Sequence, residues 1–285
     1  MDALGVMTAD GVRLLLRHTP ARGPRRGAIL AMHAMWVDGR YFDRPAGRGF
    51  ASAMAERGLD CFVLDFRGHG LSDRPARGWT LEDYVQRDLP VAIERIEQAT
   101  GLPPGAITWI GHSLGGLVSL AALSTRVVPA PRALVLATTN IWRHPPLSRR
   151  IFIEAFDASA RLFGRAPIRA LRLGTDDEPA SYVGQLAGWV RSGRFTSADG
   201  AVDYDAGLGS IALPVLSVVG RGDLLCRPED ARDLTDRLRA AHVEEIVVGR
   251  RDGFALDATH FTLWTSGRAR PLWDRIARFC AEPPG

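Results

Sequence analysis

Residues 111–116, with the letters GHSLGG, constrain the fold of this chain more than any other stretch. An apolar, strand-like run precedes them at 107–110, and a helix-like run follows at 114–123. A serine with glycine two residues to either side is typical of a tight strand-to-helix turn, in which larger neighbours would clash. The pattern therefore predicts a strained backbone at Ser113 and a hydroxyl exposed above the edge of a sheet.

Strand-like and helix-like stretches alternate toward both ends of the chain. The expected strands are 12–17, 27–32, 60–65, 107–110, 132–138, 215–219 and 243–248. The expected helices are 49–57, 81–99, 114–123, 228–241 and 270–280. This alternation predicts an α/β fold, a mainly parallel sheet with helices on both faces.

Strand-like runs are missing between residues 140 and 210. A stretch of this length is too long for an ordinary loop and too short for an independent catalytic domain. We therefore predict a core of residues 1–139 and 211–285, with a helical cap, or lid, inserted at 140–210.

Composition excludes several classes of function. The 285 residues carry 36 basic and 32 acidic groups, and this net charge of +4 is too small for a dedicated nucleic-acid surface. Every basic side chain is an arginine, which excludes Schiff-base, serine–lysine and phosphate-loop chemistry that depends on lysine. Three cysteines without close spacing predict neither disulfides nor a zinc site and fit a reducing compartment.

The same survey bears on location and partners. No uncharged apolar run reaches the roughly 18 residues of a membrane span, and the first residues lack the basic start of a secretory signal. We expect a cytoplasmic protein with no integral membrane segment and no nucleic-acid partner. The sequence leaves its oligomeric state open.

A serine nucleophile needs a base, and His260 is the best candidate among the seven histidines. It lies between the last strand and the last helix, where a parallel sheet presents residues at its carboxyl edge. His242 is expected to end a helix. His33 and His69 follow other strands and remain rivals of His260.

The base in turn needs a carboxylate that orients it. Asp223 follows the apolar strand 215–219 directly, and no acidic residue follows the strand 132–138. The chain order Ser113, Asp223, His260 is the order that accompanies this serine motif in α/β folds.

Two backbone N–H groups are candidates for an oxyanion hole. Leu114 follows the nucleophile at the start of a helix, and Met35 lies in the loop after the strand 27–32. Loss of one such donor typically lowers turnover by about 10² to 10³.

Three motifs resemble a known family. Residues 65–72 read DFRGHGLS, residues 39–42 read GRYF, and residues 111–116 form the serine motif. With these, the chain resembles serine hydrolases of the α/β-hydrolase superfamily, in particular the group of monoacylglycerol lipases, lysophospholipases and serine aminopeptidases. The resemblance covers about three quarters of the chain and leaves out the cap.

The resemblance implies a catalytic site and a reaction. Ser113 would be the nucleophile, Asp223 and His260 its partners, and Met35 and Leu114 the oxyanion donors. The implied reaction is hydrolysis of a carboxylic ester, in a small-molecule or lipid-like substrate, through an acyl-enzyme and without a metal or other cofactor. Cleavage of a thioester or an amide, or acyl transfer, would use the same residues.

One departure from the family supports a different class of function. The family's oxyanion loop begins with His-Gly, whereas this chain has His33 and Ala34, and alanine tolerates a positive φ poorly. This departure is the one feature in favour of the alternative, a non-catalytic, ligand-binding protein on the same fold. The complete set of Ser113, Asp223 and His260 weighs against that alternative, because a pure binder does not need all three. In the DFRGHGLS loop, an ion pair between Asp65 and Arg67 is expected to hold the loop in place.

The cap combines arginines with apolar residues. Between residues 140 and 175 there are seven arginines and two acidic residues. One hypothesis is an amphipathic helix with solvated arginines. The other is an apolar tunnel with a cationic mouth for anionic or membrane-bound lipid esters. The expected apolar helix face consists of Ile151, Phe152, Ala155, Phe156, Ser159 and Phe163. The candidate substrate-binding residues are Trp36, His112, Phe152, Phe156 and Trp189.

Overall fold

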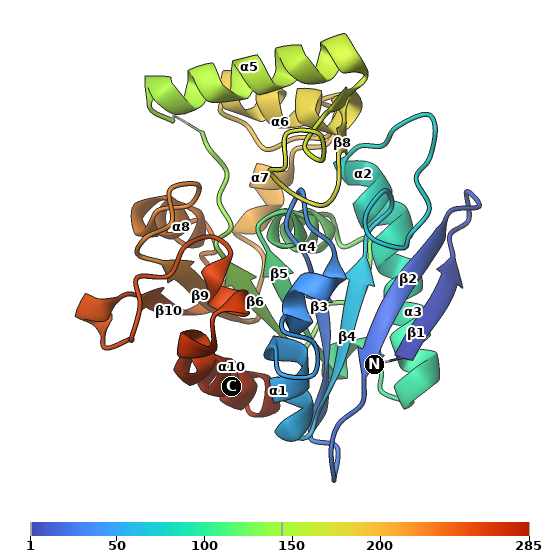
Figure 1. Ribbon diagram of the computed structural model, residues 1–285, viewed down its shortest axis with the longest axis vertical. Coiled ribbons are helices and arrows are strands. Elements are labelled where there is room, and N and C mark those ends of the chain that lie inside the picture. The colour runs from blue at the N-terminus through green and yellow to red at the C-terminus, as the bar shows by residue number, and fades with distance from the viewer. Residues whose placement is uncertain (1, 144, 285) are drawn as a thin grey trace.

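One sheet of eight strands forms the centre of the protein (Figure 1), whose computed structural model describes residues 2–143 and 145–284. The strand order is β1-β2-β4-β3-β5-β6-β9-β10. β2 pairs antiparallel with β1 and with β4, and the remaining neighbours are parallel. The strands are β1 (Asp2–Met7), β2 (Arg13–Thr19), β3 (Gly27–Met32), β4 (Leu59–Asp65), β5 (Ile107–His112), β6 (Ala133–Ala137), β9 (Pro214–Gly220) and β10 (His242–Val248). The predicted fold class, a mainly parallel sheet, is confirmed.

Helices cover both faces of this sheet, as predicted. The core helices are α1 (Phe50–Glu56), α2 (Leu81–Asp83), α3 (Leu89–Thr100), α4 (Leu114–Thr125), α8 (Pro228–Thr235), α9 (Thr262–Thr265) and α10 (Arg270–Ala281). α3 and α4 pack in one apolar cluster with one face of the sheet, and α1 and α10 pack in a second cluster with the other face. The central strands are therefore buried on both sides, which explains their continuous apolar runs.

The structure corrects several expected elements. β1 is missing from the prediction because its partly exposed residues at the sheet edge lack a clear apolar period. α8 ends at Thr235, so His242 begins β10 and does not end a helix. The expected helix 81–99 contains a wide π-type turn at Tyr84–Asp88. Pro90 follows this turn and has no N–H for the regular helical pattern.

The chain between β6 and β9 leaves the sheet and forms the segment that we call the insertion, residues 138–213. It contains α5 (Leu147–Phe163), α6 (Ala180–Ser192), α7 (Tyr204–Leu208) and a two-stranded sheet of β7 (Arg165–Ala166) and β8 (Glu178–Pro179). In Figure 1, α5 lies across the top of the molecule with α6 beneath it. α7 packs against α4 through Tyr204 and Leu208.

The apolar face of α5 differs from the expected one. Its buried residues are Ile153, Asp157 and Ala160, with Phe156 half-buried beside them. Ile151 and Phe163 lie on the exposed side, at 60% and 62% exposure. The helix carries apolar residues on more than one side, so the sequence alone does not show which side packs on α6.

The DFRGHGLS loop is held by different ion pairs from the one expected. Arg67 is fully buried and contacts Asp88, at 2.7 Å, together with Asp10 and Asp83. Asp65 instead pairs with Arg17 at 2.7 Å. The predicted pair between Asp65 and Arg67 is therefore wrong, because both partners find their counter-charges on segments distant in the sequence.

This burial gives a test of stability. Asp88→Asn removes the charge from a fully buried pair, and we expect it to lower the free energy of unfolding by about 3 kcal/mol. Asp83→Asn, which removes a partly exposed partner of the same arginine, should cost less than about 1 kcal/mol. Urea unfolding of both variants measures the difference, and equal losses would contradict the assignment of Arg67 to a core ion pair.

Candidate active site

Ser113 sits at a strained turn between β5 and α4. Its backbone angles are φ 52° and ψ −105°, a left-handed φ that is uncommon for residues other than glycine. A Cβ atom on Gly111 would lie 2.5 Å from the backbone of Gly116, and one on Gly115 would lie 2.3 Å from the Met32 carbonyl oxygen. The close approach of β5, α4 and β3 thus requires glycine here, as predicted.

A carboxylate orients His260. Nδ1 of His260 donates to Oδ2 of Asp223 at 2.8 Å, while Oδ1 of Asp223 accepts from the N–H groups of Leu225 and Cys226 at 2.8 and 3.0 Å. Asp223 is 2% exposed. With Nδ1 carrying the proton, the second ring nitrogen of His260 is free to accept one.

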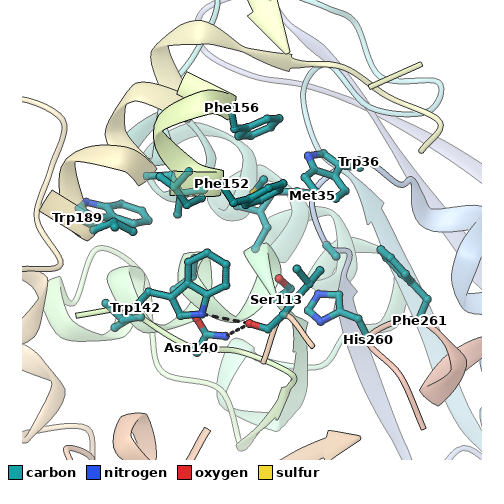
Figure 2. A pocket seen from close by; sticks show the side chains of 18 residues that line it. Met35, Trp36, Ser113, Asn140, Trp142, Phe152, Phe156, Trp189, His260 and Phe261 are labelled. Atoms are coloured by element: carbon teal, nitrogen blue, oxygen red, sulfur yellow. Dashed lines mark hydrogen bonds between the residues drawn. The ribbon is translucent and has the colours of Figure 1, made fainter. Parts of the chain in front are cut away.

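Ser113 and His260 both line one pocket, which encloses about 90 Å³ between the sheet edge and the insertion (Figure 2). Among the described residues, no hydrogen bond joins the Ser113 hydroxyl to the ring of His260. Such a contact often forms only once substrate is bound. The two groups are thus placed in the same apolar pocket, with Asp223 behind His260.

The walls of this pocket are almost entirely apolar. Among the described residues of its lining, the polar groups besides Ser113 and His260 are the indole N–H groups of three tryptophans and the amide of Asn140, which donates to the Leu225 carbonyl at 2.9 Å. Trp142 donates to the same carbonyl at 3.1 Å. The apolar lining consists of Ala34, Met35, Trp36, Leu114, Leu117, Ile141, Trp142, Phe152, Ile153, Phe156, Leu186, Trp189, Val190, Leu225 and Phe261.

Four of the five candidate substrate-binding residues lie in this lining: Trp36, Phe152, Phe156 and Trp189. The fifth, His112, does not. It is fully buried, and its Nε2 donates to the carbonyl of His260 at 3.0 Å. Burial and the neighbouring His260 lower the pKa of His112 well below its usual value, so the ring stays neutral. We therefore correct its assignment from substrate contact to support of the His260 loop.

The two rival histidines are also outside the pocket lining. His33 and His69 are both fully buried. Nε2 of His33 accepts from the N–H of Phe66 at 3.2 Å, and burial together with the adjacent His69 lowers the pKa of His33 to about 4. Neither ring is placed to take a proton from Ser113.

The two backbone N–H groups predicted as oxyanion donors belong to residues that line the pocket. Leu114 begins α4, where the first amides of a helix have no intrahelical acceptor, and Met35 lies in the loop after β3. Both residues line the pocket, and neither N–H has a hydrogen-bond partner among the described residues. The left-handed residue of this loop is Trp36, with φ 71°, and not Ala34. The expected difficulty of alanine at a positive φ is therefore absent.

Three arginines of the insertion pair with carboxylates, and one of them, Arg149, also lies over the ring of Trp142, at 5.1 Å from its centroid. Arg149 pairs with Asp230 at 2.7 Å, and Arg161 and Arg191 both contact Asp157. Within the described part of the chain, no arginine contributes to the pocket lining. This arrangement favours the hypothesis of solvated arginines over that of a cationic mouth.

Several residues of the pocket lining were not predicted as site residues from the sequence, above all Asn140, Trp142, Leu225 and Phe261. Asn140 and Leu225 follow β6 and β9, and Phe261 is adjacent to His260. Their position at the carboxyl edge of the sheet is the signal that identifies them. Only the path of the insertion brings Leu186 and Val190 of α6 to the same place, and the sequence carries no sign of it.

Fold and site together define an α/β protein with a serine at a strand-to-helix elbow and an Asp–His pair beside it. The family model for the alpha/beta hydrolase fold matches residues 36–264. The chain belongs to the alpha/beta hydrolase fold family, which confirms the superfamily that the sequence motifs predict.

Curated relatives match a part of the chain. Triacylglycerol lipase 2 from Arabidopsis thaliana is 30% identical over 139 residues, which are 42% of this chain and 32% of the relative. A tear acid lipase-like protein from Mesocricetus auratus is 27% identical over 136 residues, 42% of this chain and 33% of the relative. The match thus spans about a third of the length of these relatives.

Solved structures match nearly the whole chain. An esterase from Exiguobacterium antarcticum has a TM-score of 0.69 at 16% identity and covers 99% of this chain and 100% of its own. A monoacylglycerol lipase from Paleococcus ferrophilus has a TM-score of 0.62 at 16% identity, over 94% of this chain and 98% of its own. At this identity the likeness shows the fold alone.

Two further observations concern the described residues only. Residues 2–143 and 145–284 contain no cluster of three or more His, Cys, Asp or Glu side chains arranged to hold a metal ion. In the same ranges, every helix is too short or too polar to cross a bilayer.

The tight elbow can be tested through Gly111. Gly111→Ala places a methyl group against the Gly116 backbone, and we expect it to lower the free energy of unfolding by about 1–3 kcal/mol. The matched control is Gly188→Ala in α6, where a Cβ atom meets nothing within 4 Å and the helix should gain about 0.5 kcal/mol. Urea unfolding distinguishes them, and a neutral Gly111→Ala would contradict the described packing of the elbow.

Proposed function

We propose that this protein is a serine hydrolase that cleaves carboxylic esters of neutral, apolar acyl groups through an acyl-enzyme. The observation that carries the proposal is the placement of Ser113, at a strained elbow, in the same pocket as His260, whose other ring nitrogen is bonded to Asp223. The lipase names of the curated relatives are consistent with ester substrates.

The first half of the reaction forms the acyl-enzyme. The oxygen of Ser113 attacks the ester carbonyl carbon while His260 takes the hydroxyl proton. The carbonyl oxygen becomes an oxyanion, which accepts hydrogen bonds from the N–H groups of Leu114 and Met35. The intermediate then collapses, the bond to the alcohol oxygen breaks, and His260 protonates the departing alcohol.

The second half returns the enzyme to its starting state. Water attacks the acyl carbon and gives its proton to His260, and the same two N–H groups hold the second oxyanion. Collapse releases the carboxylic acid and returns the proton to Ser113. Throughout, Asp223 keeps the imidazole in the required tautomer and stabilises its charged form. No step requires a metal or other cofactor.

The insertion, residues 138–213, is proposed to act as the cap that closes the pocket. It supplies the apolar wall through α5 and α6, with Phe152, Phe156 and Trp189. Phe152 and Phe156 stack with ring centroids 6.0 Å apart, and the rings of Trp36 and Phe156 are in an edge-to-face arrangement with centroids 5.7 Å apart. Such a wall suits an acyl chain or an aromatic ring, and among the described lining residues there is no arginine to compensate a buried carboxylate.

The catalytic residues are tested by substitution. We expect Ser113→Ala to lower kcat for p-nitrophenyl butyrate by at least about 10⁴-fold, and Asp223→Asn by about 10⁴-fold through the wrong His260 tautomer. Ser124→Ala, at the far end of α4, is the matched control and should keep wild-type kcat. Steady-state kinetics measures all three, and a Ser113→Ala variant with wild-type turnover would refute the mechanism.

Selectivity for neutral acyl groups is tested with a pair of substrates of similar size. A carboxylate on the acyl chain would have to be desolvated in an apolar pocket, so kcat/KM for p-nitrophenyl hemisuccinate should be at least about tenfold below that for p-nitrophenyl butyrate. The comparison is made at low salt, where arginines would attract an anion most strongly. Equal values would show that arginines of the insertion reach the substrate.

A further inference from the structure

Glu178 brings a buried carboxylate from the insertion to the oxyanion loop. It lies in β8 and is fully buried. Its Oε1 accepts two hydrogen bonds, from the backbone N–H of Trp36 at 3.1 Å and from Nε2 of His69 at 3.0 Å. Trp36 directly follows Met35, whose N–H is a proposed oxyanion donor. One carboxylate thus links the insertion, the DFRGHGLS loop and the loop beside the nucleophile.

The insertion holds both peptide groups of Trp36. The Trp36 carbonyl accepts from the N–H groups of Thr175 and Asp176 at 2.6 and 3.2 Å, while its N–H donates to Glu178. A Cβ atom on Gly174 would lie 2.3 Å from the Trp36 carbonyl oxygen, so the two segments meet closely. These contacts hold a tryptophan at φ 71°, a strained conformation that persists only when its surroundings fix it.

His69 fixes the carboxylate in turn. Its Nδ1 lies 3.0 Å from the Arg67 carbonyl and its Nε2 3.0 Å from Glu178, so both nitrogens face acceptors, an arrangement that favours the imidazolium. Burial alone would lower the pKa of His69, but the charges of Glu178 and Asp176 outweigh it and raise this pKa. The neighbouring His33 stays neutral, since its Nε2 accepts from a backbone N–H.

We propose that Glu178 is a positioning residue for catalysis, which holds the N–H of Trp36 and thereby aims the N–H of Met35 at the oxyanion. The proposal rests on the function proposed above. Trp36 N–H and the Met35 carbonyl form one peptide group, so the bond to Glu178 fixes the orientation of the residue that supplies the donor. Since the oxyanion exists only after attack, loss of this support lowers kcat and leaves KM nearly unchanged.

The test compares three variants with wild type. Glu178→Ala removes the acceptor. Glu178→Gln keeps an oxygen of the same reach but not the charge. Asp177→Asn is the matched control in the same segment: Asp177 accepts from the N–H of Arg169 at 2.8 Å and pairs with Arg165 at 3.3 Å, and among the described residues it forms no hydrogen bond to Trp36 or His69. Each variant is assayed with p-nitrophenyl butyrate for kcat and KM per titrated active site, with a trifluoromethyl ketone inhibitor for Ki, and for its Tm.

The proposal predicts a specific pattern. Glu178→Ala should lower kcat by about 10- to 100-fold with KM within about threefold, and should raise the Ki of the ketone, whose adduct carries an oxyanion, by a similar factor. Glu178→Gln should recover kcat to within about fivefold of wild type, because its oxygen can still accept from Trp36. Asp177→Asn should keep the wild-type kcat and Ki.

Other outcomes overturn the inference. A Glu178→Ala variant with wild-type kcat and a lowered Tm would show a purely structural role, and so would equal losses in Glu178→Ala and Asp177→Asn. If Glu178→Ala does not fold, Glu178→Asp replaces it: this keeps a carboxylate charge in the site, withdraws the accepting oxygen from Trp36 and His69 together, and should lose kcat likewise. Wild type without ester turnover would overturn the proposed function and this inference with it, whereas an active wild type and an unaffected Glu178→Ala overturn the inference alone.

Discussion

The tight turn from β5 into α4 is the constraint on which the rest of the site depends. It holds Ser113 at a left-handed φ and places the N–H of Leu114 at the start of a helix that is buried from Leu114 to Leu123. Gly111 and Gly115 allow the backbones of β5, α4 and β3 to approach more closely than any Cβ atom would permit. One short segment therefore determines the position of Ser113, the strain of its backbone and the N–H that Leu114 can donate.

The remaining groups of the site reach this turn from loops at the carboxyl edge of the sheet and from the insertion. Asp223 follows β9 and accepts a hydrogen bond from the ring of His260. The neutral ring of His112 donates to the backbone carbonyl of His260. α5 and α6 close the pocket with apolar side chains, and Arg149, Arg161 and Arg191 of these helices pair with carboxylates that do not line it. The pocket therefore has few polar side chains, and Ser113 and His260 are the ones that can take part in a reaction.

Much of the fold was predictable because its signals are local. A strand, a glycine-flanked serine and a helix are adjacent in sequence, and apolar runs mark the buried strands. Partner choice across long distances was not predictable: Arg67 pairs with Asp88 and not with Asp65, and Glu178 lies 109 residues from His69. Which side of α5 is buried also depends on where α6 lies, and the pattern of apolar residues in α5 does not predict that position. The candidate site was thus predictable at its backbone motifs and, within the insertion, at the aromatic residues Phe152, Phe156 and Trp189. The contributions of Glu178 and of Leu186 and Val190 were not predictable.

The central claim is that Ser113 is an activated nucleophile, and covalent labelling tests it most directly. Purified protein is treated with a fluorophosphonate, and the modified residue is located by mass spectrometry, with Ser113→Ala treated in parallel. The account predicts one adduct on Ser113 of the wild type and none on the variant. An unlabelled wild type, or a label that persists in Ser113→Ala, would contradict it and would favour a ligand-binding protein on the hydrolase fold.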